Sequence, residues 1–128
     1  MNKELRDKVY NKYNGRCAYT GKPLGDDWQV DHAYSKYQHD YHKIQSDVND
    51  ISNLMPALRI VNHYKRELSI EGFRWYLKDF HLRLSKLPKK TRLDRTKKRI
   101  AYMEEVANAF NITINKPFSG KFYFETIK

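Results

Sequence analysis

Cys17 is the only cysteine in this chain of 128 residues. No disulfide can therefore form within the chain, and a zinc site built from four of its cysteines is excluded. The length lies in the size range of one domain, so we expect residues 1–128 to form a single domain with a modest core. Packing alone must hold that core, or packing with the help of another ion or of a partner.

The charge balance favours a polyanionic partner. Lys and Arg number 25 against 15 Asp and Glu, which gives a formal net charge of +10. An excess of this size is typical of proteins that bind nucleic acid, which is the first candidate. The alternative is a basic protein without a specific partner. The charge says nothing about catalysis.

The hydropathy pattern gives no sign of a membrane protein. Residues 1–16 lack the apolar run of a signal peptide, and no stretch approaches the roughly 20 apolar residues that cross a bilayer. We therefore expect a cytoplasmic protein without a membrane partner.

Two elements are predicted in the first part of the chain. Apolar residues four apart over residues 4–13 indicate a short amphipathic helix, and the Asn-Gly pair that follows supplies a stop. Residues 28–30 read as a strand, with Asp31 and His32 at its end. The polar residues 33–50 show no clear period, so a long loop or a loosely paired second strand is expected there.

A second helix is predicted over residues 57–68. Pro56 fits its first turn, where the missing backbone donor does no harm. The spacing gives this helix an apolar side and a polar, cationic side. The apolar side comprises Leu58, Val61, Tyr64 with Lys65, and Leu68, and the polar side comprises Arg59, Asn62 and Arg66.

Three further elements are predicted towards the C-terminus. Ser69 can cap a helix whose apolar spacing continues until Pro88. Another helix is predicted from Ile100 to Phe110. The alternation of side chains over residues 121–127 predicts a strand of a C-terminal β-hairpin.

A basic segment lies between these helices. Residues 89–99 hold seven Lys and Arg side chains against one acidic residue, Asp94. This charge is enough for a local phosphate-binding patch, and a solvated helix face or linker is an equally open alternative. The residues that we expect to contact nucleic acid here are Lys89, Lys90, Arg92, Lys97 and Lys98.

Two adjacent residues, Asp31 and His32, begin the candidate site. Phosphodiester hydrolysis needs an activated water and a means of neutralising negative charge. A histidine suits the first task, and the side-chain oxygens of Asp31 and Asn62 suit a hard divalent ion. Adjacent strand residues point to opposite faces, so Asp31 and His32 can serve one site only if the strand bends or ends there.

Asn53 and Asn62 cannot lie on one helix face. Nine residues at about 100° each would place them on opposite sides of a continuous helix. Asn53 is therefore expected before the helix, with its amide bracing the loop that carries His32. Asn62 would face the metal from within the helix, and Arg59 and Arg66 would flank the scissile phosphate.

The ordered set resembles the HNH endonuclease family and its ββα-metal motif. The resemblance covers about residues 9–80, and it implies an α+β fold with a ββα-metal (His-Me finger) core. Additional packing helices and the C-terminal β-hairpin would surround that core, with residues 81–128 as a basic helical and β extension. The matching residues are Val30-Asp31-His32, Asn53-Leu54-Met55-Pro56-Ala57 and Asn62-His63-Tyr64-Lys65.

The resemblance also implies a role for each residue. His32 would be the general base and Asn53 would orient it, while Asp31 and Asn62 would bind one divalent ion, magnesium or manganese. The implied activity is metal-dependent hydrolysis of double-stranded DNA. The residues expected to hold phosphates near the helix are Arg59, Lys65 and Arg66.

One part of the family pattern is absent. Many relatives hold a structural zinc through two CxxC pairs, which correspond here to residues 17–20 and 58–61. Three of the four ligand positions are not cysteine. Because Leu58 and Val61 are apolar, we expect a small hydrophobic cluster with Cys17 as a buried thiol, and no structural zinc.

Other interpretations stay open. The chain could be a non-catalytic DNA-binding or assembly module that keeps the HNH fold, or a nuclease that cuts RNA. His63 is a backup metal ligand, and His39, Asp40 and His42 are either a second metal site or ordinary polar loop residues. The resemblance favours a phage or mobile-element setting, with packaging, homing and restriction all open. The sequence specifies no oligomeric state.

Overall fold

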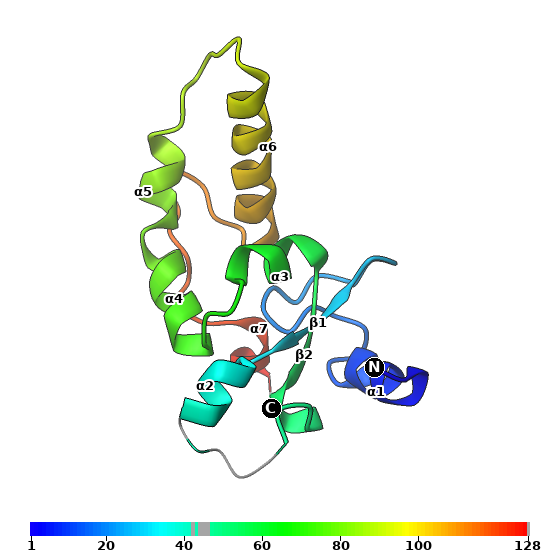
Figure 1. The fold of residues 1–128 in the computed structure, drawn as a ribbon. Coiled ribbons are helices and arrows are strands. Elements are labelled where there is room, and N and C mark those ends of the chain that lie inside the picture. The colour runs from blue at the N-terminus through cyan, green and yellow to red at the C-terminus, as the bar shows by residue number, and fades with distance from the viewer. Residues whose placement is uncertain (42, 44–46, 128) are drawn as a thin grey trace. The chain divides into compact units, whose positions relative to one another are not determined.

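The computed structural model describes residues 1–41, 43 and 47–127. Within these residues the fold is mixed α+β, with seven α-helices and a two-stranded antiparallel sheet (Figure 1). The chain divides into two compact units. Unit 1 is Met1–Phe73 with Phe122–Lys128, and unit 2 is Arg74–Lys121. The α+β class is confirmed.

The first helix lies where the sequence predicts it. Helix α1 (Lys3–Asn11) begins after Asn2, whose Oδ1 accepts the backbone N–H of Leu5 at 2.8 Å. The helix ends at Asn11, and the Asn-Gly pair in the turn that follows adopts left-handed backbone angles, with φ of 57° at Asn14 and 76° at Gly15.

The sheet of unit 1 consists of β1 (Gln29–His32) and β2 (Leu54–Ala57). The strands are antiparallel, with Val30 opposite Pro56 and His32 opposite Leu54. Strand β1 therefore ends at His32, as a shared site of Asp31 and His32 requires. The partner strand lies at 54–57. A loosely paired strand within residues 33–50 was one of the two expectations, and no strand occurs in the described part of that segment (33–41, 43 and 47–50).

The expectation for Pro56 is wrong. Pro56 is paired in β2 and not in the first turn of a helix. Proline is tolerated at the edge of a sheet because the N–H that it lacks is not needed there. Its carbonyl accepts the N–H of Ala18 at 2.8 Å, which ties β2 to the segment around Cys17. All four residues of β2 are buried, so the strand shows no alternation that would have revealed it.

Helix α3 (Arg59–Lys65) follows β2 directly and contacts β1. It is shorter at both ends than the predicted helix over 57–68, because Leu58 is extended and Arg66 has a φ of 55°. Figure 1 shows α3 beside the end of the sheet, so that its residues can meet those of β1.

The described residues between the strands include two helical elements that the sequence did not predict. Helix α2 (Lys36–Tyr41) begins after Ser35, whose Oγ accepts the N–H of Gln38 at 3.2 Å. The Gln38 Oε1 accepts the Ser35 N–H at 2.9 Å in return. This reciprocal pair is the capping box that a Ser-x-x-Gln sequence predicts. A short 3₁₀ helix, Ile51–Asn53, leads into β2.

The C-terminal segment forms a helix and not the predicted β-hairpin. Helix α7 (Tyr123–Thr126) begins after Phe122, whose N–H is accepted by Glu125 Oε1 at 2.9 Å. The backbone N–H groups of Tyr123 and Phe124 donate to residues 19 and 18, at 3.1 and 2.9 Å. The alternation of apolar residues over 121–127 therefore does not mark a strand. Its main structural contribution is one buried anchor, Phe122, which is 0% exposed.

The core of unit 1 has two parts. One is an apolar cluster of Val9, Trp28 and Leu54, between α1 and the sheet. The other is aromatic, with Phe122 stacked on Phe73 at 5.4 Å between ring centroids and edge-on to Tyr19 at 5.2 Å. The aromatic part thus packs the C-terminal segment against Tyr19, whose contact with Asp31 is described below.

Unit 2 is helical. Helix α4 (Ile70–Lys78) crosses into it from unit 1 and begins next to Ser69, whose Oγ accepts the Gly72 N–H at 3.0 Å, as predicted. The single helix expected up to Pro88 is interrupted at Asp79 (φ −105°, ψ 17°), after which α5 (Phe80–Ser85) follows.

Helix α6 (Asp94–Ala109) packs beside α5 within unit 2 (Figure 1). It begins six residues before the predicted start at Ile100. The later part of the basic segment is therefore helical.

Replacement of Phe122 tests the C-terminal packing. Phe122→Ala removes a fully buried ring, so we expect it to lower the free energy of unfolding by about 3–5 kcal/mol. Ile127→Ala, at a side chain that is 40% exposed, is the matched control and should change stability little. Urea denaturation followed by circular dichroism measures both. Equal effects of the two substitutions would contradict the packing described here.

Candidate active site

A pocket of about 420 Å³ lies in unit 1, where β1 ends beside α3. Asp31 and His32 line it from the strand, and Asn62 and Arg66 line it from α3 and its C-terminal end. The structure thus brings together the acid, the imidazole and the second amide that the sequence singles out.

Asp31 is held from the protein interior by two side chains. It is only 4% exposed, and Lys65 Nζ lies 3.2 Å from Oδ1 and 3.1 Å from Oδ2. The hydroxyl of Tyr19 donates to Oδ2. Lys65 and Tyr19 are 0% and 1% exposed, so both approach from the side away from solvent.

Burial acts on the protonation of all three groups. Desolvation raises the pKa of Asp31, and the nearby Lys65 ammonium and the Tyr19 hydroxyl oppose that rise. Desolvation lowers the pKa of Lys65, against the attraction of Asp31. The pKa of Tyr19 is raised well above its ordinary value by burial and by the adjacent carboxylate. Each group is therefore charged in the interior only at a desolvation cost.

The expectation that Lys65 contacts a phosphate is wrong. Its ammonium is fully buried and also donates to the backbone carbonyl of His32 at 3.0 Å. Lys65 therefore connects α3 to the last two residues of β1. The helical spacing had placed Lys65 on the apolar side of its helix, and the structure follows that spacing and not the charge.

Asn62 lies on the same side of α3 as Lys65, three residues earlier. Its Nδ2 donates to Gln29 Oε1 at 2.7 Å. Gln29 and Asp31 are two apart and share a face of β1. Two strand residues thus meet two helix residues, and the bond from Nδ2 leaves the Asn62 amide oxygen for another partner.

The ring of His32 contacts a residue that no motif in the sequence singles out. His32 Nε2 lies 2.9 Å from Oδ1 of Asn49. Both residues line the pocket, and Asn49 comes from the turn before β2.

Asn53 braces the backbone, as expected, but no contact with the His32 ring is formed. Its Nδ2 donates to the carbonyls of Tyr34 and Val48 at 3.0 and 2.8 Å, and its Oδ1 accepts the Tyr34 N–H at 2.9 Å. Its side chain is 7% exposed. Asn53 thus joins the loop after His32 to the turn that carries Asn49.

Sequence reasoning missed several residues around the pocket. Tyr19 lies in a stretch dense in turn formers, and nothing in its surroundings in sequence marks it as a partner of Asp31. Gln29 could have been found, because strand periodicity places it on the face of Asp31. Asn49 and Glu67 line the pocket without any motif to identify them.

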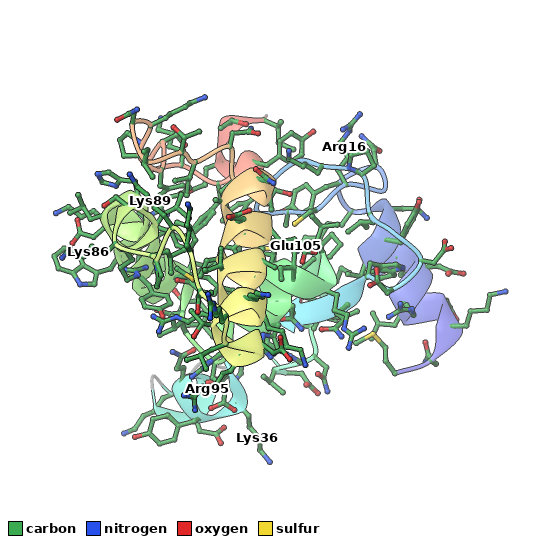
Figure 2. The ribbon with its side chains drawn as sticks, turned by 90° about the horizontal axis from the view of Figure 1, so that it is seen from above. Arg16, Lys36, Lys86, Lys89, Arg95 and Glu105 are labelled. Atoms are coloured by element: carbon green, nitrogen blue, oxygen red, sulfur yellow. The ribbon has the colours of Figure 1, made fainter. Side chains whose placement is uncertain are left out.

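The expected nucleic-acid contacts other than Lys65 are exposed. Arg59 and Arg66 are exposed at the start and the end of α3. Lys36 also lines the pocket, and its side chain extends outward from α2 (Figure 2). In unit 2 the exposed residues include Lys89 and Arg95, both labelled in Figure 2. The remaining predicted contacts there, Lys90, Arg92, Lys97 and Lys98, are exposed as well.

The alternative metal ligands lie elsewhere. His63 is exposed and is not part of the pocket lining. His39 is buried and Asp40 is exposed, while His42 lies outside the described residues. In the described ranges, no group of three or more His, Cys, Asp or Glu side chains is placed to hold a metal ion.

The segments that correspond to the two CxxC pairs are largely buried. Cys17 and Val61 are 0% exposed, and Leu58 is half-buried. Cys17 is a free thiol. The expectation of a buried thiol is confirmed, and a hydrophobic cluster of Cys17 with Leu58 and Val61 stays a prediction.

Comparisons with protein-family models, with curated proteins and with solved structures found no match to this chain. Among the described helices, none has the length and apolar character needed to span a membrane.

Removing one partner of the buried ion pair tests its contribution to stability. Lys65→Met leaves the Asp31 carboxylate buried without its cation, so we expect a loss of about 3–5 kcal/mol in the free energy of unfolding. The double variant Asp31→Asn/Lys65→Met removes both charges and should lose markedly less. Urea denaturation of the single and double variants measures this difference. A double variant that loses as much stability as Lys65→Met, or more, would show that the two side chains do not interact as described.

The raised pKa of Asp31 predicts a dependence of stability on pH. Above the ordinary Asp value of about 3.9, the folded state retains a proton that the unfolded chain has released. As the pH rises across that window, the free energy of unfolding of the wild type should therefore fall relative to that of Asp31→Asn/Lys65→Met. Urea denaturation in the presence of EDTA, from acid to neutral pH, measures the difference. A constant difference would contradict the direction of the shift.

Proposed function

We propose that the chain is a metal-dependent endonuclease that hydrolyses phosphodiester bonds of DNA. The observation that carries this proposal is the convergence of Asp31, His32 and Asn62 on one pocket beside exposed Arg66. The succession of β1, β2 and α3 is the order that a ββα-metal core requires. The resemblance of the sequence to HNH endonucleases supports the same activity.

The residues present fit a hard divalent ion. A carboxylate has about four lone-pair positions. Lys65 and Tyr19 make three contacts with Asp31, which also lines the pocket. The Asn62 amide oxygen would be the second ligand, because Gln29 already accepts from the amide nitrogen. Oxygen ligands of this kind favour magnesium or manganese.

When bound, such an ion supplies stabilisation of negative charge on the leaving oxygen of the phosphodiester. His32 accepts the proton of the attacking water, since its half-buried ring lines the same pocket. Lys65 holds Asp31 and the carbonyl of His32 in place, so the two residues at the end of β1 keep a fixed relation.

Exposed cations would hold the nucleic-acid backbone. Arg66 lies at the pocket, and Arg59 is exposed at the other end of α3. Such contacts are made with phosphates, so they would give affinity with strong salt dependence and little sequence preference. The basic residues of 89–99 are further candidates for phosphate contacts, within unit 2.

A plasmid cleavage assay tests the proposal. Wild type with magnesium or manganese should convert supercoiled DNA to open or linear forms, and EDTA should stop the reaction. His32→Ala removes the base and should lower the rate by about 10²–10⁴-fold. His63→Ala, on the exposed side of α3 and outside the pocket, is the matched control and should cut like the wild type.

The assay also distinguishes the rival functions. A non-catalytic DNA-binding module would bind DNA while both wild type and His32→Ala stay inert with either metal. An RNA nuclease would leave the plasmid intact and cut a parallel RNA substrate.

A further inference from the structure

We propose that Asn49 is the positioning residue of His32, and that Asn53 acts on the catalytic ring only through the turn that carries Asn49. This inference rests on the proposed nuclease function and names a residue that neither the motif nor its resemblance includes. Three sets of contacts support it, from the ring outward.

The first contact fixes the ring. The His32 Nε2 faces the Asn49 Oδ1 at 2.9 Å. A carbonyl oxygen only accepts hydrogen bonds, so Nε2 carries the hydrogen in this pair. The neutral ring then has its lone pair on Nδ1, which becomes the atom that accepts the proton of the attacking water. One hydrogen bond thus selects both the tautomer and the direction of the base.

The second set of contacts fixes Asn49. Its backbone N–H donates to Oδ1 of Asp47 at 2.8 Å, and the Asp50 N–H donates to the carbonyl of Asp47 at 2.9 Å. Asp50 Oδ1 in turn accepts the N–H of Ser52 at 2.9 Å. These local bonds close a tight turn of the kind that Asp residues favour. The Asn49 side chain therefore projects from a defined backbone.

The third set attaches the turn to the site. Asn53 Nδ2 donates to the carbonyl of Val48, the residue before Asn49, at 2.8 Å. Its remaining bonds go to the N–H and the carbonyl of Tyr34, two residues after His32. Lys12 Nζ anchors the end of the same turn through the carbonyls of Ile51 and Leu54, both at 2.8 Å. Through its bonds to Val48 and Tyr34, Asn53 sets the distance between Asn49 and His32.

Two substitutions at one position separate the side-chain role from the fold. Asn49→Ala removes the acceptor oxygen, while Asn49→Asp retains an oxygen in the same place. Both variants keep the backbone N–H that Asp47 accepts, so the turn is preserved. Misorientation of the base should lower kcat of Asn49→Ala by about tenfold to a hundredfold with KM little changed. Asn49→Asp should keep kcat within about threefold, because its carboxylate accepts the same bond.

Asn115→Ala is the matched control. Asn115 is likewise an exposed turn residue whose N–H donates to a side-chain oxygen two residues earlier, that of Thr113, at 3.3 Å. Its kcat should equal that of the wild type. An equally active Asn49→Ala would overturn the inference, and so would an equal loss of kcat in Asn49→Ala and Asn49→Asp.

A spectroscopic measurement tests the ring contact without reference to activity. Nitrogen-15 spectra of the neutral His32 imidazole, assigned with His32→Ala, should show the hydrogen on Nε2 in the wild type. A hydrogen on Nδ1 would overturn the inference even in an active enzyme. A wild type that cuts no nucleic acid would instead refute the proposed nuclease function, and with it the role of Asn49, although the ring contact would still be seen.

Discussion

The buried ion pair between Lys65 and Asp31 is the interaction on which the rest of unit 1 depends. It joins the last turn of α3 to the end of β1, and a further bond from Lys65 to the His32 carbonyl fixes the residue that follows. Because the pair is almost fully enclosed, Coulomb attraction is little screened by water. The position of the helix relative to the strand, and so the placing of Asn62 opposite Gln29, follows from this connection.

Side-chain bonds to backbone groups organise the other half of the pocket. In the turn before β2, Asn53, Lys12 and Asp47 bond to backbone N–H and carbonyl groups. Hydrogen bonds of this kind fix the backbone of the turn, so the loss of one bond can displace a side chain of the site. The two halves of the site therefore differ in what holds them, an enclosed charge pair on one side and a bonded turn on the other.

The sequence predicted elements where local signals agree, and failed where burial or a distant partner decides. The first helix, the Ser69 cap and the end of the strand at His32 follow from spacing and capping residues. Strand β2 was not predicted because it is buried on both faces and so shows no alternation. The helix at Tyr123–Thr126 was predicted as a strand because the apolar residues around one buried anchor, Phe122, happen to alternate. Lys65 shows both outcomes: its periodicity gave the correct side of the helix, while its charge suggested the wrong environment. Tyr19 and Asn49 could not be found, since their contacts join residues 12 and 17 positions apart.

Burial of the charges of Asp31 and Lys65 costs desolvation free energy, and the role of Asp31 in the pocket offers a reason for that cost. Apolar residues at positions 31 and 65 would avoid the desolvation penalty that raises one pKa and lowers the other, and buried pairs of this kind often add little net stability. An apolar side chain at position 31 would, however, present no oxygen to the pocket. Lys65 permits a carboxylate that is 4% exposed to line that pocket while its charge is balanced from the interior. The ion pair is thus better explained by what Asp31 offers to a ligand than by what the pair adds to the fold.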